Sequence, residues 1–239
     1  MTIPSRVYSA IDDSYRKENL PMKAFKTLTA RILALALIPM MVCLASCGMT
    51  LKEAGSSGAI DKDSGVAWKH ASTCYEAITL GKKVGKLNVT EKYTLNLHEI
   101  EDMDPSLWLA TEEGNVLYTH QATLPTLAEM KPTSMLICVE NETSRVLGNL
   151  QDAQKIDAII SAYTQNESLV YPAISMARTY RVRFVSPDYP GIYYTLTYVE
   201  YAEDYVHDEV NYGKYFLYSA FDKVFVPVGD EIHVTLGLG

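Results

Sequence analysis

The chain has few cysteines and lacks the local motifs that mark common catalytic sites. Only four cysteines occur among its 239 residues, and no two form a C-x-x-C pair, so a zinc or redox site is not indicated. It contains no G-x-S-x-G motif, no P-loop and no glycine-rich dinucleotide fingerprint. The five histidines, His70 among them, are scattered without metal-ligand spacing. An enzyme that gathers carboxylates and histidines from separate strands leaves no local signature, and this class stays open.

The larger part of the chain also lacks a basic cluster. Residues 1–46 hold six of the 21 Lys and Arg residues and three of the 29 Asp and Glu residues, so residues 47–239 hold 15 basic and 26 acidic ones. The net charge of that part is therefore −11. Nucleic acids bind to concentrated basic surfaces. We expect no nucleic-acid partner, and no motif predicts a cofactor.

One apolar run stands out, but it is too short to cross a membrane. Residues 32–44 carry no charged or strongly polar side chain, whereas a spanning helix needs about 20 such residues. Lys23, Lys26 and Arg31 precede the run, and small residues end it. A basic start, a short apolar middle and a small-residue end are typical of an export signal. We therefore predict a signal peptide over residues 22–46.

The apolar run ends in a sequence that resembles the lipobox of bacterial lipoproteins, Leu44-Ala45-Ser46-Cys47. The resemblance implies that the signal is cut before Cys47 and that the thiol of Cys47 carries diacylglycerol. Two acyl chains give a stable anchor, whereas one binds only marginally. The expected partner is thus membrane lipid, through acylated Cys47, on the extracytoplasmic side of the cell membrane or outer membrane. An ordinary secretory signal and a buried core helix are the alternatives.

Residues 1–21 precede this signal and do not resemble any part of it. The codons of Arg16, Lys17 and Glu18 can form a purine run that resembles a bacterial ribosome-binding site, at a suitable distance before a start codon at Met22. We therefore predict that translation starts at Met22 and that residues 1–21 are not part of the protein. A genuine N-terminal extension is the alternative.

After the signal, the composition divides the chain into a tether and a domain. Residues 47–65 are rich in Gly, Ser and charge and have little to bury. We predict that they begin with the lipidated Cys47 and form a flexible tether. Residues 66–239 are then the globular domain, long enough to bury roughly 70% of its unfolded surface.

The domain shows mainly strand patterns and one clear helix. Tyr93, Leu95 and Leu97 alternate with polar residues, as in a half-buried strand. Further strands are expected at residues 115–120, 135–141, 178–186, 192–201, 214–220 and 224–228. An apolar stripe over residues 151–164 predicts one amphipathic helix. Short turns between the strands predict an α+β fold, an antiparallel meander sheet with this helix packed on one face.

Tyrosine is unusually common, with 17 residues, nine of them between positions 189 and 218. On alternating strands these side chains occupy both faces of the sheet, so one set can fill the core and another can face solvent. An exposed tyrosine offers a large, rigid contact area with a polar tip. The candidate binding residues are Tyr193, Tyr201, Tyr205 and Tyr212. Cross-strand packing is the alternative.

Two further sets of residues carry candidate chemistry. Cys74 and Cys138 remain in an exported domain, where a disulfide between them is chemically permitted. Two separate buried thiols are the alternative. Acidic side chains crowd one segment between two strands, and oxygen ligands at this density can hold a calcium ion. The candidate calcium ligands are Glu203, Asp204, Asp208 and Glu209, and a solvated loop without a ligand is the alternative.

Together these features predict a membrane-anchored lipoprotein whose folded part is a non-catalytic binding module of unknown ligand. The expected partner in that role is an envelope protein, a peptide or a glycan. A cell-envelope hydrolase that uses Asp, Glu and His residues from separate strands is the alternative. The stretches "DMDPSLWLATEEG" (102–114) and "SPDYPGIYY" (186–194) are similar to small uncharacterised lipoproteins of Gram-positive bacteria, and this similarity implies no activity.

Overall fold

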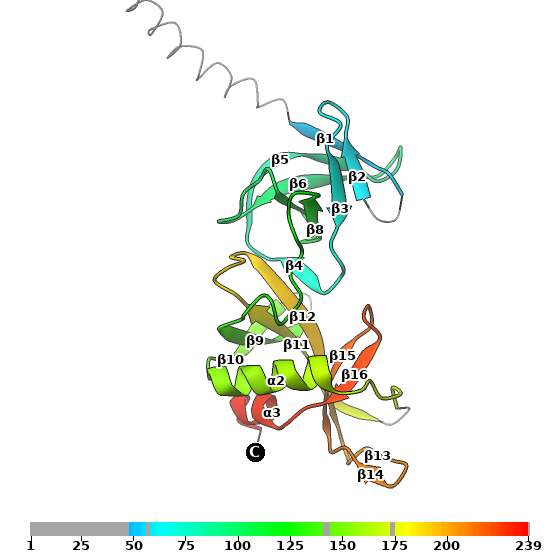
Figure 1. Cartoon of the computed structure of the whole chain (residues 1–239), viewed down its shortest axis with the longest axis vertical. Helices are drawn as coiled ribbons and strands as arrows, with labels where there is room; N and C mark the ends of the chain where they lie inside the picture. The colour runs from blue at the N-terminus through cyan, green and yellow to red at the C-terminus, as the bar shows by residue number, and fades with distance from the viewer. Residues whose placement is uncertain (1–47, 56–57, 141–143, 173–174, 239) are drawn as a thin grey trace, which may run out of the picture. The chain divides into compact units, whose positions relative to one another are not determined.

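The first strands of the described chain close into a barrel (Figure 1). The computed structural model describes residues 48–55, 58–140, 144–172 and 175–238. The barrel strands are β1 (Met49–Glu53), β2 (Gly58–Asp61), β3 (Ala67–His70), β5 (Leu80–Asn88), β6 (Thr94–Ile100), β7 (Trp108–Thr111) and β8 (Val116–Thr119). Their order around the barrel is β1-β2-β3-β8-β7-β6-β5. The pair β1–β5, which closes it, is parallel, and the other neighbouring pairs are antiparallel.

Inward-pointing side chains fill the barrel. Every second residue of a strand points to the same face, and Leu51, Leu97 and Leu117 are fully buried in one cluster that also contains Trp68. Gly85 lies on β5 where that strand meets β1, and a Cβ atom there would collide with the backbone of β1 at Met49. Glycine at this position therefore allows the parallel pair to form and the barrel to close.

A second sheet follows in the chain. Its strands are β9 (Ser134–Glu140), β10 (Ser144–Leu150), β11 (Met176–Val185), β12 (Ile192–Tyr201), β15 (Tyr215–Ser219) and β16 (Val224–Pro227). They pair in the order β10-β9-β11-β12-β15-β16, and the short β4 (Tyr75–Ala77) pairs with the first part of β12. All these pairs are antiparallel. A small hairpin of β13 (Val206–His207) and β14 (Val210–Asn211) lies between β12 and β15 in the chain.

The helices α2 (Ala153–Gln165) and α3 (Glu231–Thr235) pack on one face of this sheet (Figure 1). The carboxylate of Asp152 caps α2 by accepting hydrogen bonds from the backbone N–H groups of the residues two and three positions later. The buried stripe of α2 is the one that its sequence predicts: Ile156, Ile159, Ile160 and Tyr163. Within the described residues, no helix is both long and apolar enough to span a membrane.

The barrel and the sheet share one hydrophobic core. Trp108 and Ala110 on β7 belong to the same buried cluster as Phe184 and Tyr194 of the sheet, whereas the intervening Leu109 faces the inside of the barrel. The strand β4 connects the two parts, because it pairs with β12 and also forms a bridge to the turn between β7 and β8. Through β4, the β7–β8 end of the barrel is attached to the sheet.

The predicted α+β meander with one main helix is wrong. The described structure is mostly β, with a closed seven-stranded barrel and two short helices. The sheet order is not sequential either, since β9 lies between β10 and β11. The prediction failed because alternation within a strand shows which face is buried but does not show which strand is its neighbour.

The predicted flexible tether at residues 47–65 is wrong from Met49 onward. β1 and β2 lie in this segment and supply two neighbouring strands of the barrel. Their apolar residues are few, but Leu51 and Ala59 are buried in the barrel cluster. Residues 1–47, which include the predicted signal peptide and Cys47, lie outside the described residues.

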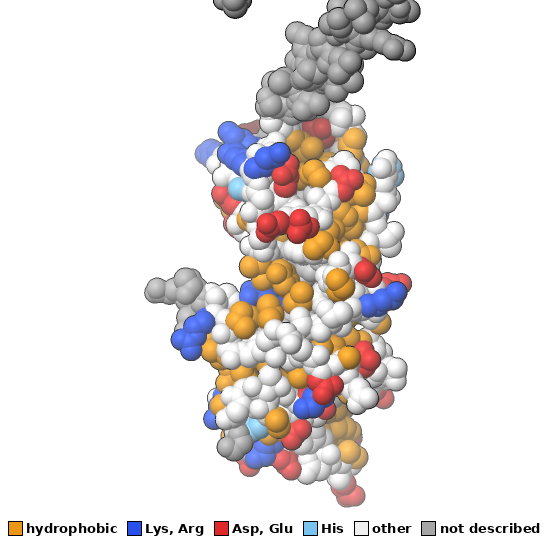
Figure 2. All heavy atoms as spheres, turned by 90° about the vertical axis from the view of Figure 1, so that its left-hand side faces the viewer, with side chains coloured by type: hydrophobic (Ala, Val, Ile, Leu, Met, Phe, Trp, Pro, Cys, Tyr) orange, Lys and Arg blue, Asp and Glu red, His pale blue; other side chains and the backbone are white. Residues whose placement is uncertain are grey.

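The surface carries charges of both signs. On the face shown in Figure 2, Lys and Arg side chains gather over the barrel, with Asp and Glu side chains close to them. Among the exposed residues of β5 are Lys82, Lys83 and Lys86, and Lys82 forms an ion pair of 3.3 Å with Glu99 on the neighbouring strand. One of the basic side chains of this strand, that of Lys82, is therefore paired with an acidic neighbour.

Candidate functional site

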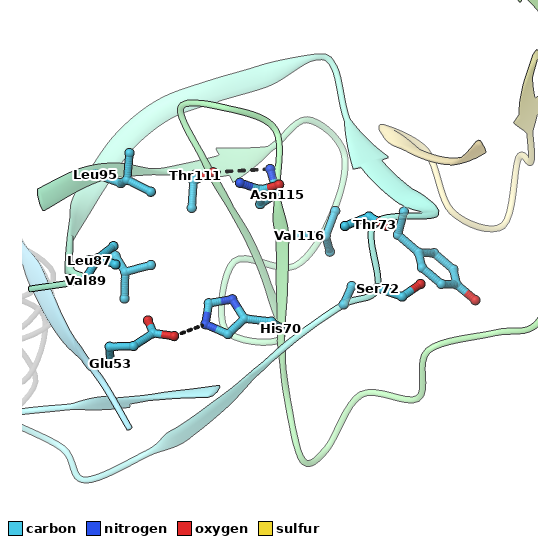
Figure 3. Close-up of a pocket in the computed structure, with 12 residues that line it drawn as sticks. Glu53, His70, Ser72, Thr73, Leu87, Val89, Leu95, Thr111, Asn115 and Val116 are labelled. Atoms are coloured by element: carbon cyan, nitrogen blue, oxygen red, sulfur yellow. Dashed lines mark hydrogen bonds and ion pairs between the residues drawn. The ribbon is translucent and has the colours of Figure 1, made fainter. Parts of the chain in front are cut away.

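A cavity of about 220 Å³ opens at the end of the barrel where β1 and β3 finish (Figure 3). We call it the barrel-end cavity. Its lining includes the polar residues Glu53, His70, Thr111 and Asn115 and the apolar residues Leu87, Val89, Leu95 and Val116. The mouth of a β-barrel is a frequent place for a ligand site, because the strands hold the lining side chains in fixed positions.

Strand geometry directs Glu53 and His70 into this cavity. Leu51 and Glu53 are two residues apart on β1, and Trp68 and His70 are two residues apart on β3, so each pair points to one side of its strand. Leu51 and Trp68 lie inside the barrel. Glu53 and His70 therefore continue the inward-facing rows at the end of the barrel, where Figure 3 shows them pointing toward each other.

The carboxylate of Glu53 has one partner. Its Oε1 lies 2.9 Å from Nε2 of His70, and each of the two side chains is 24% exposed. Its Oε2 is buried, and no donor among the described residues reaches it. Leaving a buried acceptor without a donor costs about 1–3 kcal/mol, and more when the acceptor is charged. The cavity thus contains a strong acceptor that a bound molecule can satisfy.

Two other polar side chains of the lining are hydrogen-bonded within the protein. The Oγ1 of Thr111 accepts a hydrogen bond of 3.2 Å from the backbone N–H of Asn115. The hydroxyl of Tyr75 donates to the carbonyl of Pro125. Burial raises the pKa of Tyr75, so this hydroxyl stays protonated at ordinary pH. Glu53 is the lining residue that has a buried polar atom with no donor among the described residues.

An open groove of about 600 Å³ adjoins the barrel-end cavity, and Glu53 and Val89 line both. The remaining lining residues of the groove are Lys52, Lys62, Asn88, Thr90 and Glu91. Both lysines are exposed. The surface next to the cavity therefore carries two positive charges and the carboxylate of Glu91.

A second polar cluster surrounds Asp222, in the turn between β15 and β16. Its Oδ2 accepts hydrogen bonds from the hydroxyls of Tyr163 at 2.7 Å, Tyr194 at 3.0 Å and Ser219 at 3.0 Å. Burial alone would raise the pKa of Asp222, but these donors outweigh it and lower the pKa. The Cys74 thiol lies 3.5 Å from the same oxygen, and burial raises its pKa, so it is not an activated nucleophile. This cluster holds α2, β12 and the turn together.

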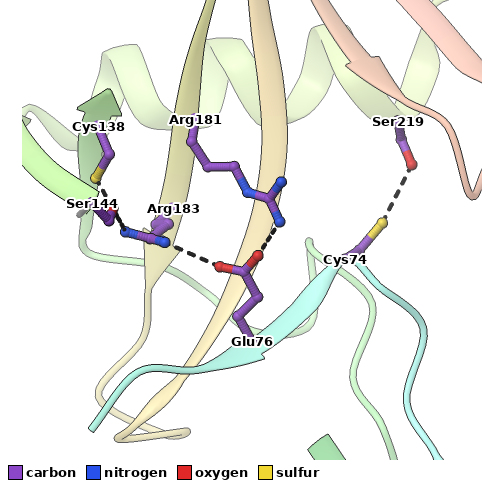
Figure 4. A network of polar contacts seen from close by, with 7 residues as sticks. All are labelled: Cys74, Glu76, Cys138, Ser144, Arg181, Arg183 and Ser219. Carbon is purple, nitrogen blue, oxygen red and sulfur yellow. Dashed lines mark hydrogen bonds and ion pairs between the residues drawn. The ribbon is translucent and has the colours of Figure 1, made fainter. Parts of the chain in front are cut away.

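A third cluster lies on the face of the sheet that is turned away from α2 (Figure 4). Arg181 and Arg183 are two residues apart on β11, and both pair with Glu76 of β4. The Nε of Arg183 is 3.2 Å from Oε2 of Glu76, and its Nη1 donates to the hydroxyl of Ser144 at 2.7 Å. Nη1 also lies 3.5 Å from the sulfur of Cys138. Both carboxylate oxygens of Glu76 are occupied, and the cluster links β4 to β10 and β11.

The structure buries two of the four tyrosines predicted to bind a partner. Tyr201 is 1% exposed and Tyr205 is 8% exposed, and both rings pack against Phe216. The prediction is wrong for these two, because the sheet is covered on both faces rather than on one. Tyr193 and Tyr212 are half-buried, at opposite ends of the strand–hairpin segment. The four do not form one binding surface.

The predicted calcium site does not assemble. Within the described residues, no group of three or more His, Cys, Asp or Glu side chains is placed to hold a metal ion. The candidate ligands lie in or beside the β13–β14 hairpin: Glu203, Asp204, Asp208 and Glu209. Asp204 instead accepts a hydrogen bond of 2.8 Å from Asn211, and Asp208 lies 3.4 Å from His207.

The two cysteines of the domain are separate thiols. Cys74 and Cys138 are both free and buried. Cys74 precedes β4 and contacts Ser219, whereas Cys138 lies on β9 opposite Arg181. The predicted disulfide between them is therefore not formed, and the alternative of two buried thiols describes the structure.

The two central residues of the barrel-end cavity were not among the predicted site residues. Glu53 falls in the predicted tether, and His70 is one of five scattered histidines. A local signal existed, since residues 49–53 alternate apolar and polar side chains until Glu53 takes an inward position. Its meaning depends on the barrel, which the sequence did not reveal.

Comparisons with known proteins do not extend this description. The scan against protein-family models found no match, and no match was found among the curated proteins or the solved structures. Function must therefore be inferred from the arrangement of the residues themselves.

Proposed function

We propose that this chain is a membrane-anchored lipoprotein on the extracytoplasmic side whose folded part is a binding module. The barrel-end cavity is its ligand site. The observation that carries the proposal is that Glu53 lines a cavity while its buried Oε2 has no donor among the described residues. A ligand that supplies a hydrogen-bond donor removes the free-energy cost of leaving this oxygen without a partner. The anchor is supported by the lipobox-like residues 44–47.

The size of the cavity favours a small group. Its volume of about 220 Å³ is below the roughly 300–1,000 Å³ of pockets that enclose drug-sized ligands. One end group of an envelope protein, peptide or glycan fits this space, as does a small free molecule. The adjoining groove, which Glu53 also lines, gives the rest of a larger partner a path along the surface.

A hydrolase is the second candidate, and one observation favours it. The 2.9 Å contact between Glu53 and His70 resembles the pairing that orients a histidine for general acid–base catalysis. The buried thiol of Cys74 does not support it, since its pKa is raised by burial and it lies in the Asp222 cluster. Binding is therefore the function that we place first.

A screen of small molecules with the full-length protein tests the binding function. Thermal shift identifies compounds that raise the unfolding temperature, and calorimetry measures their affinity. Ala71 lines the barrel-end cavity, whereas Ala202 is exposed in the loop after β12. We expect Ala71→Leu to fill the cavity and abolish binding and Ala202→Leu to leave it unchanged. Failure to find any compound with this behaviour would refute the proposal, and breakdown of a hit that His70→Asn prevents would favour the hydrolase.

Mass spectrometry of the native product tests the anchor. We expect a mature N-terminus at Cys47 that carries two acyl chains, and loss of membrane attachment in Cys47→Ala. An unmodified chain that is released into the medium or retained in the cytosol would contradict the lipid anchor. This outcome would leave the binding function of the folded part intact.

A further inference from the structure

The chemistry of the barrel-end cavity indicates which ligand it takes. Glu53 presents one carboxylate oxygen to His70 and has a second oxygen that is buried and without a donor in the described structure. A buried anionic acceptor is best satisfied by a donor that also carries positive charge, because such hydrogen bonds are about twice as strong as neutral ones. We infer that the ligand carries a primary ammonium group that binds the carboxylate of Glu53. This inference rests on the proposed binding function.

The remaining lining describes the part of the ligand next to the ammonium. Leu87, Leu95 and Val116 offer aliphatic surface, beside polar residues such as Ser72, Thr73 and Asn115. A polyhydroxylated group would lose its hydrogen bonds to water against the aliphatic side chains, whereas methylene groups gain by leaving water. A short aliphatic stem next to the ammonium, as in a lysine side chain or an aliphatic amine, therefore matches the aliphatic part of the lining.

The charge around the cavity is consistent with this orientation. Residues 47–239 carry a net charge of −11, which attracts cations to the molecule as a whole. Lys52 and Lys62 stand in the adjoining groove, outside the cavity. They repel a second positive charge on the same ligand, so its far end is expected to be neutral or anionic.

Two matched compounds test the inference on the full-length protein. A linear aminopentanol has one terminal ammonium and one hydroxyl, and pentanediol has the same chain with two hydroxyls. We expect calorimetry to show that aminopentanol binds about tenfold more tightly, because only its ammonium adds charge attraction to the hydrogen bond with the carboxylate. Equal affinities, or no binding of the amine, would overturn the inference.

Substitutions distinguish the site from the acidic surface. Glu53→Gln keeps the shape of the side chain and an oxygen that can accept from His70, but it removes the charge. We expect this variant to lose the preference for aminopentanol over pentanediol. Glu167→Gln removes an exposed carboxylate after α2, which lines neither the cavity nor the adjoining groove, and is expected to keep the preference. A Glu53→Gln variant that unfolds like the wild type in denaturant and still prefers the amine would refute the role of Glu53.

The outcomes separate this inference from the proposed function. Neutral compounds that bind in the small-molecule screen and lose affinity in Ala71→Leu, together with no preference for the amine, would overturn the ammonium ligand and leave the cavity as a binding site. Absence of any cavity ligand in that screen would overturn both. Selective amine binding that depends on Glu53 supports both.

Discussion

Substitution of Asp222 by Asn should measure how strongly one carboxylate holds the second sheet to its helix. Oδ2 of Asp222 accepts hydrogen bonds from Tyr163 on α2, Tyr194 on β12 and Ser219 at the end of β15. Asparagine keeps an oxygen near this position but loses the charge. The substitution therefore converts three charged hydrogen bonds into neutral ones without removing the acceptor.

The expected loss follows from the difference between the two kinds of bond. Hydrogen bonds to charged groups contribute about 1.5–3 kcal/mol and neutral ones about 0.5–1.5 kcal/mol, so three bonds lose about 3–4 kcal/mol when the midpoints of these ranges are compared. Asp222 as a residue is exposed, and water near the carboxylate screens part of this difference. We expect a loss of about 2–3 kcal/mol in the free energy of unfolding, or about 4–12 °C in Tm for a domain of this size.

The pH dependence gives a sharper test. The donors lower the pKa of folded Asp222 below that of the unfolded chain, so its contribution is complete above an unfolded pKa of about 3.9 and is lost as pH falls through the folded pKa. The stability difference between wild type and Asp222→Asn should be largest near neutral pH and shrink below about pH 4. Guanidinium unfolding monitored by tryptophan fluorescence at several pH values measures it.

Asp208→Asn is the matched control. The Asp208 side chain is 87% exposed, and its backbone has a φ of 47°, which asparagine tolerates. This variant should stay within about 0.5 kcal/mol of the wild type. The reasoning would be refuted if Asp222→Asn were as stable as Asp208→Asn at neutral pH, or if its deficit did not change in acid.

Two further predictions concern the junction of barrel and sheet and the buried thiols. Gly114→Ala should destabilise the protein more than Gly55→Ala: both glycines have a positive φ, but a Cβ on Gly114 would lie 2.7 Å from the carbonyl oxygen of Ala77 on β4, whereas nothing lies within 4 Å of one on Gly55. Equal unfolding midpoints for the two variants would contradict this close approach. Cys74 and Cys138, 4% and 0% exposed, should resist a thiol reagent in the native protein and react in denaturant. Peptide mapping checks this, and a peptide that joins the two cysteines would contradict it.

Local patterns in the sequence located much of the secondary structure. The expected strands at 93–100 and 192–201 correspond to β6 and β12, and the expected helix at 151–164 corresponds to α2. These predictions succeeded because alternation and helical periodicity are properties of residues that are close together in the sequence. They depend only on which side of each element meets the core.

The barrel could not be predicted in this way. Its β1 and β2 are short and lie in a stretch rich in Gly, Ser and charge, which resembles a linker. β5 contains Gly81 and Gly85, which weaken a strand pattern by sequence criteria. The structure shows why Gly85 is needed, since a side chain there would meet the backbone of β1. Gly85, which weakens the strand pattern in the sequence, thus permits the long-range pairing of β1 with β5 that closes the barrel.

The prediction that a set of tyrosines faces solvent and binds a partner failed for a related reason. β12 was expected to bury one face and expose the other, yet Tyr198 is buried on the helix side and Tyr201 on the opposite side. The segment after α2 covers that opposite side, where the N–H of Leu169 donates to the carbonyl of Phe225 at 2.8 Å. An alternating pattern of tyrosines cannot show whether a distant segment will cover the second face.

Glu53 is a candidate site residue because the pairing of β1 with β5 closes the barrel around it. It ends β1, and Leu87 and Val89 line the cavity from the end of β5 and just beyond it. β1 and β5 are the parallel pair that closes the barrel, with Leu51 opposite Leu87. In a solvated tether the carboxylate of Glu53 would bind water at both oxygens, and its chemistry would be that of any surface glutamate. In the closed barrel one oxygen of Glu53 is buried, and no donor among the described residues reaches it. The proposed ligand site therefore depends on the strand pair that closes the barrel.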